Sequence, residues 1–276
     1  MQIIDAHQHF WIYDPIRDSW IDNSMSVLKQ DYLPEDLNTI INDVGVKGTI
    51  AVQASQSRQE TEFLLSLAGK FNFIKGVVGW LDLQSSQLEE ELLTFKSNTK
   101  LKGFRHILQG EKDRSFMLQH EFIRGIRMLE KYGYTYDILI YKDQLKYIPQ
   151  FLADFKQQRF VLDHLAKPDI KNKEIMEWKK EILKLKPFTN LYCKISGFVT
   201  EADWKNWKPQ DFKVYFDVIV DVFGIDRILF GSDWPVCLLA ANYKEVLQIL
   251  KDYFSNYSKD EQQKVFASNA ISFYNL

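Results

Sequence analysis

Two histidines one residue apart close the first apolar stretch of the chain, in the segment IIDAHQH at residues 3–9. Side chains at positions i and i+2 of a strand point to the same face. His7 and His9 therefore direct two imidazoles toward one point, where they can bind a metal ion, polarise a carbonyl group or move a proton. Burying both rings with no ligand between them costs free energy, which favours a functional role over a core role.

Two further apolar runs end in residues with similar chemistry. The segment VLDHLAKP at residues 161–168 carries His164, and FGSDWP at residues 230–235 carries Asp233. When parallel strands form a barrel, their carboxyl ends meet at one mouth, where active sites lie. We therefore expect these two residues to converge with His7 on a single site.

The elements that must position these residues alternate between strand and helix along the chain. Short runs rich in Val, Ile, Leu and Phe, bounded by turn residues, predict eight strands covered on both faces. They are residues 3–7, 48–54, 74–81, 102–107, 135–140, 159–164, 190–195 and 227–231. Helical spacing of apolar residues lies between them, for example after Pro34 and before Gly224.

Eight strands with intervening helices are the expected pattern for a (β/α)8 TIM barrel of the α/β class, here a single domain over residues 1–276. A doubly wound open sheet is the alternative, but no Gly-rich phosphate loop follows any strand. The long aromatic segment 11–32 follows the first strand, and such loops usually shape the pocket of a barrel.

The bulk composition is that of a globular protein without a charged partner. The net charge is −2, which gives no electrostatic reason to expect nucleic acid or an anionic membrane. No apolar run approaches the roughly 18 residues that a membrane span needs, and the start lacks the features of a signal peptide. Cys193 and Cys237 are expected as buried free thiols. We expect a cytoplasmic protein, and the oligomeric state stays open.

The order of the motifs resembles one enzyme superfamily. The segments DAHQHFW (5–11), GFRH (103–106), LDHLAKP (162–168) and GSDWP (231–235) occur in the order found in the amidohydrolase superfamily. They are most similar to its amidohydrolase-related branch, which holds lactonases of the L-fuconolactonase, L-rhamnonolactonase and 2-pyrone-4,6-dicarboxylate lactonase types. The resemblance implies a barrel hydrolase that opens a small lactone, most simply a sugar-acid lactone.

The resemblance also implies a role for each polar strand end. His7, His9 and His164 would hold the lactone carbonyl, Asp233 would take a proton from the attacking water, and Arg105 would bind ring oxygens or a carboxylate. Structural alternatives are a helix cap for Asp233, a strand-end histidine for His164 and a surface arginine for Arg105. Further candidates for substrate contact are Trp11, Gln53, Trp80, His106, Tyr136, Lys194 and Trp234.

The same residues allow catalysis with or without a metal. Metal-dependent members of the superfamily add a carboxylated lysine or a glutamate, and histidines on strands five and six. Here strand four ends in Arg105, whose guanidinium repels a divalent ion, and strand five has no histidine. We therefore favour catalysis without a cofactor. A single Zn²⁺ or Mn²⁺ bound by His7, His9, His164 and Asp233 is the alternative.

Two other functions are compatible with the same residues. A metal-dependent decarboxylase shares the barrel and the His-x-His start, and a non-catalytic protein could bind a sugar acid. A lactone is more reactive than an amide, so a carboxylate base can suffice, which favours lactone hydrolysis. The stereochemistry of the substrate depends on loop residues such as Tyr13, Arg17, Trp20 and Gln53.

Overall fold

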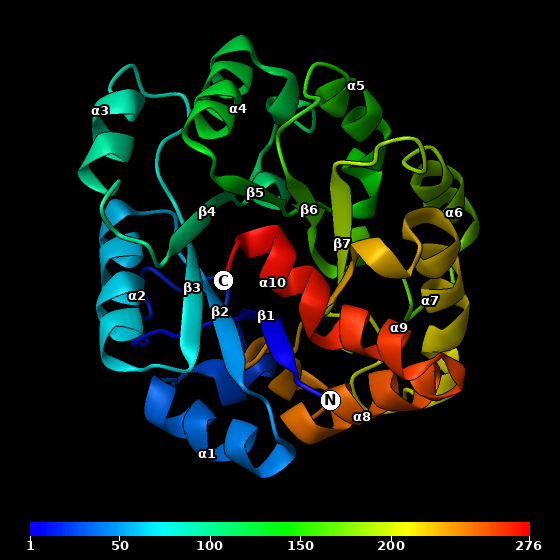
Figure 1. The fold of residues 1–276 in the computed structure, drawn as a ribbon. Helices are drawn as coiled ribbons and strands as arrows, with labels where there is room; N and C mark the ends of the chain where they lie inside the picture. The colour runs from blue at the N-terminus through cyan, green and yellow to red at the C-terminus, as the bar shows by residue number, and fades with distance from the viewer.

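Eight parallel strands form the centre of the computed structural model, which describes residues 1–276 (Figure 1). Each strand pairs with the next along the chain, and Gln8 of β1 forms a parallel bridge with Trp234 after β8. The sheet thus forms a nearly closed barrel, which confirms the predicted (β/α)8 fold and excludes the open sheet. The strands are β1 (Ile4–Gln8), β2 (Gly48–Val52), β3 (Ile74–Gly79), β4 (Leu101–His106), β5 (Thr135–Ile138), β6 (Phe160–Leu162), β7 (Leu191–Ile195) and β8 (Ile228–Phe230).

Several strands end earlier than their apolar runs predict. The run 159–164 contributes only Phe160–Leu162 to the sheet, because a helical turn, Asp163–Ala166, starts directly after it. The chain therefore leaves the sheet where the polar residues of the motif begin. Apolar character continues into this turn because its residues are buried.

Helices cover the outside of the barrel between successive strands (Figure 1). They are α1 (Pro34–Val44), α2 (Arg58–Lys70), α3 (Leu88–Thr94), α4 (His120–Tyr132), α5 (Ile148–Ala153), α6 (Met176–Leu183), α7 (Pro209–Phe223) and α8 (Tyr243–Tyr253). α1 begins at Pro34, as the sequence predicts, and ends before Gly45, whose φ of 78° suits glycine. α7 likewise begins at a proline and ends before Gly224.

The C-terminal segment crosses the barrel at the amino ends of the strands, where it is red in Figure 1. It consists of α9 (Lys259–Gln263), a π-helical turn (Lys264–Ser268) and α10 (Asn269–Tyr274). Its buried residues pack with inward-facing side chains of the strands. This cluster comprises Ile4, Ala6, Ile50, Val52, Val78, Val161, Leu229, Ala267, Ala270, Phe273 and Tyr274. The amino end of the barrel is therefore closed by apolar packing, which leaves the carboxyl end for the site.

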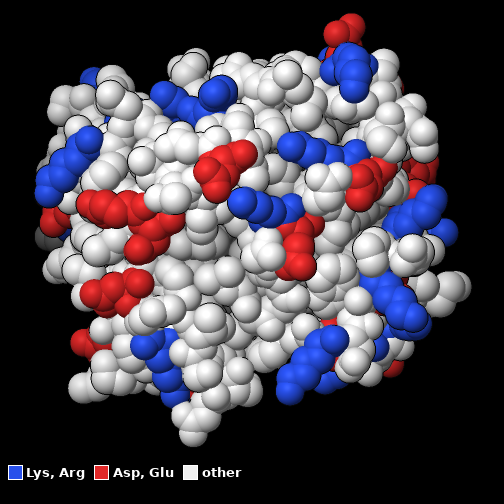
Figure 2. All heavy atoms as spheres, turned by 90° about the horizontal axis from the view of Figure 1, so that it is seen from below, with Lys and Arg blue, Asp and Glu red and all other residues white.

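The surface is mixed in charge. On the face drawn in Figure 2, basic and acidic side chains alternate and do not gather into a patch of one sign, as the net charge of −2 suggests. None of the helices combines the length and the apolar character that crossing a membrane would require.

Candidate active site

Three histidines and one aspartate meet at the carboxyl end of the barrel. The Nε2 atoms of His7 and His9 are 3.2 Å apart. Asp233 Oδ1 lies 3.4 Å from His9 Nε2, 3.7 Å from His7 Nε2 and 3.9 Å from His164 Nε2. All four residues are buried. The structure therefore brings together the four residues that the sequence places at strand ends.

Local irregularities of the backbone aim these side chains. Between Asp5 and Gln8 the pairing of β1 with β2 shifts register, and such an irregularity re-aims a side chain. His9 lies just beyond β1, where its N–H donates to Trp234 O at 2.7 Å. The N–H of Asp233 donates in turn to His7 O at 2.8 Å. These bonds lock the first and last strand ends together.

Gly197, after β7, makes room for the cluster. Its φ is +60°, and a Cβ there would lie 2.5 Å from His164 Nδ1 and 3.1 Å from Asp233 Oδ2. A side chain at this position would push the imidazole out of place. Glycine is therefore required both by the backbone conformation and by the close approach.

The second nitrogen of each imidazole has a partner that orients the ring. His9 Nδ1 is 2.8 Å from the carbonyl oxygen of Val52, which can only accept, so Nδ1 carries the proton and the lone pair of Nε2 faces the cluster. His164 Nδ1 lies 2.9 Å from Ser196 Oγ. His7 Nδ1 lies 3.1 Å from Lys194 Nζ and 3.4 Å from Asp163 Oδ1. A carbonyl partner, as at His9, and a nearby carboxylate, as at His7, are typical of histidines that bind a metal.

The protonation states suit a cation. Burial lowers the pKa of His164 to about 4, so the ring is neutral at neutral pH. Burial alone would raise the pKa of Asp233, but the imidazoles of His164, His9 and His7 hold it below the usual value. Metal ligands must be deprotonated to bind. His164 and Asp233 can therefore bind an ion without first losing a proton.

The spacing also fits a metal ion. Ligand atoms on a tetrahedral Zn²⁺, with bonds of about 2.0–2.1 Å, are about 3.3 Å apart. The ligand atoms of His7, His164 and Asp233 all lie within 4.8 Å of one another, and His9 Nε2 is 3.2 Å from His7 Nε2. One carboxylate oxygen and three imidazole nitrogens form a donor set that zinc accepts.

A charged network lies beneath the cluster, inside the barrel. Lys194 Nζ is 2.5 Å from Asp137 Oδ2, 3.1 Å from Asp163 Oδ1 and 3.1 Å from His7 Nδ1. The hydroxyl of Tyr274, from α10, donates to Asp137 Oδ2 at 2.9 Å. Lys194, expected to touch substrate, is completely buried. That expectation is corrected, because the ammonium group pairs with carboxylates below the pocket.

Arg105 belongs to the same network. One terminal nitrogen lies 3.1 Å from Asp163 Oδ2 and 3.3 Å from His7 Nε2, and the other donates to Gln53 O. Only Nε lacks a partner. The guanidinium borders the pocket, but most of its donors are already used by the protein. Arg105 therefore holds Asp163 and the His7 ring, and its contact with substrate stays a prediction.

Three residues of the cluster, His9, His164 and Asp233, form the floor of a pocket of about 460 Å³ at the mouth of the barrel. Among the residues expected at the site, His9, Trp11, Arg105, His164 and Asp233 line it. The remaining lining residues are Trp20, Met25, Ala54, Ile107, Gln109, Gly110, Leu139, Tyr141, Lys167 and Val236. Sequence reasoning named only Trp20 among these, as a residue of the long loop.

Five other expected contacts are not among the lining residues of this pocket, and their contact with substrate stays a prediction. Gln53 is buried and donates to Arg105 O at 3.0 Å. His106 pairs with Glu111 at 2.7 Å and accepts from the Trp80 indole at 3.3 Å. Tyr136 is buried among phenylalanines, and Trp234 packs on Phe10 and Tyr32. Their neighbours in the fold enclose Gln53, Tyr136 and Trp234, although one polar atom of each has no hydrogen-bond partner.

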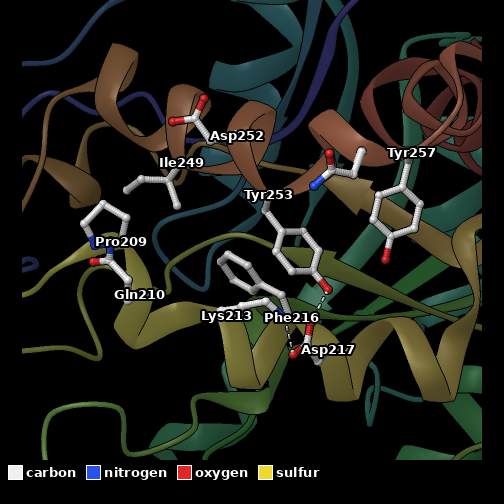
Figure 3. A pocket seen from close by; sticks show the side chains of 10 residues that line it. Pro209, Gln210, Lys213, Phe216, Asp217, Ile249, Asp252, Tyr253 and Tyr257 are labelled. Atoms are coloured by element: carbon white, nitrogen blue, oxygen red, sulfur yellow. Dashed lines mark hydrogen bonds and ion pairs between the residues drawn. The ribbon is translucent and has the colours of Figure 1, made fainter.

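A second hollow, of about 360 Å³, lies between α7 and α8 on the outside of the barrel (Figure 3). Asp217, in the lining of this hollow, accepts from Lys213 at 2.8 Å and from the Tyr253 hydroxyl at 2.9 Å, so Lys213 and Asp217 are paired. The hollow includes none of the strand-end residues. The pocket above the histidines is therefore the candidate active site.

Comparison with known proteins identifies the family. The amidohydrolase family model matches residues 4–276, and the chain belongs to this family. It is 39% identical to an L-fucono-1,5-lactonase of Burkholderia multivorans, over 99% of this chain and 96% of that protein. It is 30% identical to an L-fucono-1,5-lactonase of Burkholderia ambifaria, over 99% of this chain and 95% of the other.

A solved structure of an amidohydrolase from Burkholderia multivorans with bound zinc is 39% identical. It matches all of both chains with a TM-score of 0.97. This zinc, together with the group of His7, His164 and Asp233, shows that the expectation of a site without a cofactor is wrong. Arg105 does not exclude the ion because Asp163 balances its charge.

Proposed function

We propose that this protein is a hydrolase that opens the ring of a sugar-acid lactone of the L-fucono- or L-rhamnonolactone type. The observation that carries the proposal is the cluster of three imidazoles and Asp233 at the floor of a pocket with an apolar wall. The family, and the lactonases that resemble the chain over 99% of its length, support the same reaction.

The residues of the cluster divide the work of hydrolysis. His7, His9, His164 and Asp233 would hold a divalent ion, with zinc the best supported. When bound, the ion would polarise the lactone carbonyl and acidify the attacking water. Asp233 accepts a proton from that water as the new carbon–oxygen bond forms, and returns it to the ring oxygen as the ester bond breaks. The product is an open-chain hydroxy acid.

The wall of the pocket suits the apolar part of such a substrate. Trp11, Met25, Ile107, Leu139 and Val236 lie on the lining. L-Fuconic and L-rhamnonic acids are 6-deoxy acids that end in a methyl group, and an apolar wall can enclose that group. The indole of Trp11 offers a flat face on which a sugar ring can pack.

The test is hydrolysis of a panel of lactones, followed with a pH indicator, with and without a chelator. We expect hydrolysis of L-fucono-1,5-lactone and L-rhamnonolactone, loss of activity after chelation, and recovery with Zn²⁺. L-Galactonolactone, which carries a hydroxyl on C6, should react more slowly by no more than about a hundredfold, because an apolar pocket rejects an added hydroxyl only weakly.

Three results would contradict the proposal. Zinc-loaded protein that hydrolyses none of the sugar-acid lactones would exclude the function. Binding of these lactones without turnover would favour a sugar-acid binding protein, and release of CO₂ from an aromatic acid would favour a decarboxylase.

A further inference from the structure

The chain after β6 adopts a left-handed turn without any glycine. His164, Leu165, Ala166 and Lys167 have φ values of 53°, 56°, 55° and 50°. This conformation costs roughly 1–2 kcal/mol for each residue with a side chain. Such strain persists only where surrounding contacts fix it, and it gathers at functional sites.

Identifiable contacts hold the turn in place. The N–H of Lys167 donates to His164 O at 2.8 Å and closes the turn. The indole of Trp178, from α6, donates to Leu165 O at 2.7 Å. Leu165 and Ala166 are completely buried. Leu165 and Ala166 therefore anchor the turn in the core, while the side chains of His164 and Lys167 can face the pocket.

The turn brings its two end residues to the same side. Residues three apart on a helical turn are neighbours, and both His164 and Lys167 line the pocket. His164 points to the ligand cluster. The conformation thus brings the Lys167 side chain to the same pocket as His164.

The ammonium group of Lys167 retains donors for a ligand. Its Nζ lies over the ring of Tyr141, 5.3 Å from the centroid. The nearest paired carboxylate oxygen, Glu201 Oε1, is 3.6 Å away, which is longer than a hydrogen bond. The side chain is 18% exposed. By contrast, the terminal nitrogens of Arg105 already donate hydrogen bonds to Asp163 and to the carbonyl oxygen of Gln53.

We propose that Lys167 is a specificity-determining residue that donates hydrogen bonds to ring hydroxyls of the lactone, with Tyr141 and Glu201 holding its ammonium group in position. The inference rests on the proposed function. It adds that Lys167 selects lactones whose ring carries hydroxyl groups over plain alkyl lactones. The apolar wall alone would accept both.

The test combines two substrates with three variants. Lys167→Met should raise KM for L-fucono-1,5-lactone by about 10–100-fold, because it removes the hydrogen bonds that the charged ammonium group donates to the ring hydroxyls. The change in kcat should be smaller. The same variant should leave kcat/KM for δ-hexanolactone, which has no ring hydroxyl, within about twofold. Lys167→Arg should recover part of the loss. Lys179→Met, at an exposed lysine of α6, is the matched control and should behave as wild type.

Each other outcome overturns the inference. An unchanged KM for the sugar lactone means no contact, and an equal loss on both lactones means a general effect on the site. Lower zinc content or melting temperature in Lys167→Met means a structural role. If wild type does not turn over δ-hexanolactone, the comparison uses the inhibition constant of δ-hexanolactone, measured with the sugar lactone as substrate, in place of kcat/KM. Wild-type protein inactive on every lactone would refute the proposed function, whereas active wild type with an unaffected Lys167→Met refutes this inference alone.

Discussion

The two ends of the barrel interior differ sharply, although the same strands build both. At the amino end, Ile4, Ile50 and Leu229 meet Phe273 of α10 in a wholly apolar cluster. At the carboxyl end, within a few residues along the strands, the interior holds paired charges around Lys194 and then the imidazole cluster. Apolar packing at the amino end holds the barrel together. At the carboxyl end, burying the polar groups costs free energy unless they pair with one another or bind a ligand.

The charged layer is balanced within itself. Asp137 and Asp163 face Lys194 and Arg105, and all four are buried. Two negative and two positive groups leave no net charge beneath the ion, so the layer neither attracts a second cation nor repels the first.

The largest effect is expected for Asp233→Asn. The amide cannot accept the proton of the attacking water, and it is a weaker ligand, so kcat/KM for L-fucono-1,5-lactone should fall by about 10³-fold or more. Circular dichroism should show an unchanged fold, because the side chain is not part of the apolar core. Near-normal activity of this variant would remove Asp233 from the mechanism.

Lys194→Met should break the charged layer. Removing one partner of a buried ion pair leaves Asp137 and Asp163 underpaired, at a cost of about 3–5 kcal/mol in the free energy of unfolding. Urea unfolding measures this loss. The double variant Lys194→Met, Asp137→Asn should recover part of it because fewer unpaired charges remain. A double variant less stable than Lys194→Met would contradict the pairing.

The stability of metal-free protein should depend on pH through His164. Burial lowers its folded pKa to about 4, against about 6.5 in the unfolded chain. As pH falls below 6.5 the unfolded chain binds the proton first, so about 3 kcal/mol of stability should be lost between pH 6.5 and 4. Above pH 6.5 the contribution is complete. Unfolding at several pH values should show a shallower slope for His164→Gln, and equal slopes would speak against the buried neutral ring.

The smallest effect is expected for Tyr274→Phe. The side chain of Tyr274 contacts both regions, and this substitution removes only its contact with the charged layer. The ring stays in the apolar cluster, whereas the hydroxyl that donates to Asp137 is lost. Because Lys194 still pairs with Asp137, the free energy of unfolding should fall by only about 1–2 kcal/mol. Combined with Asp137→Asn, the substitution should cost less than alone. Additive losses would show that the hydroxyl does not act through Asp137.

Local patterns were enough to predict the barrel and the four clustered residues. Strand ends can be recognised from apolar runs, and His7, His164 and Asp233 lie at or just beyond them. Lys194 was misplaced because a strand-end residue points to the pocket, the barrel interior or the outer helices according to register. Lys167 was missed because its position depends on a left-handed turn that no glycine marks. The metal was misjudged because the charge of Arg105 was considered without Asp163.

The contact between Tyr274 and Asp137 ties the site to the order of synthesis. Residue 274 leaves the ribosome after every strand, yet its hydroxyl completes the bonding of Asp137 and its helix closes the amino end of the barrel. A nascent chain without α10 exposes the lower interior to water and leaves the layer under His7 incomplete. The layer under His7 is therefore complete only when α10 has packed against the barrel.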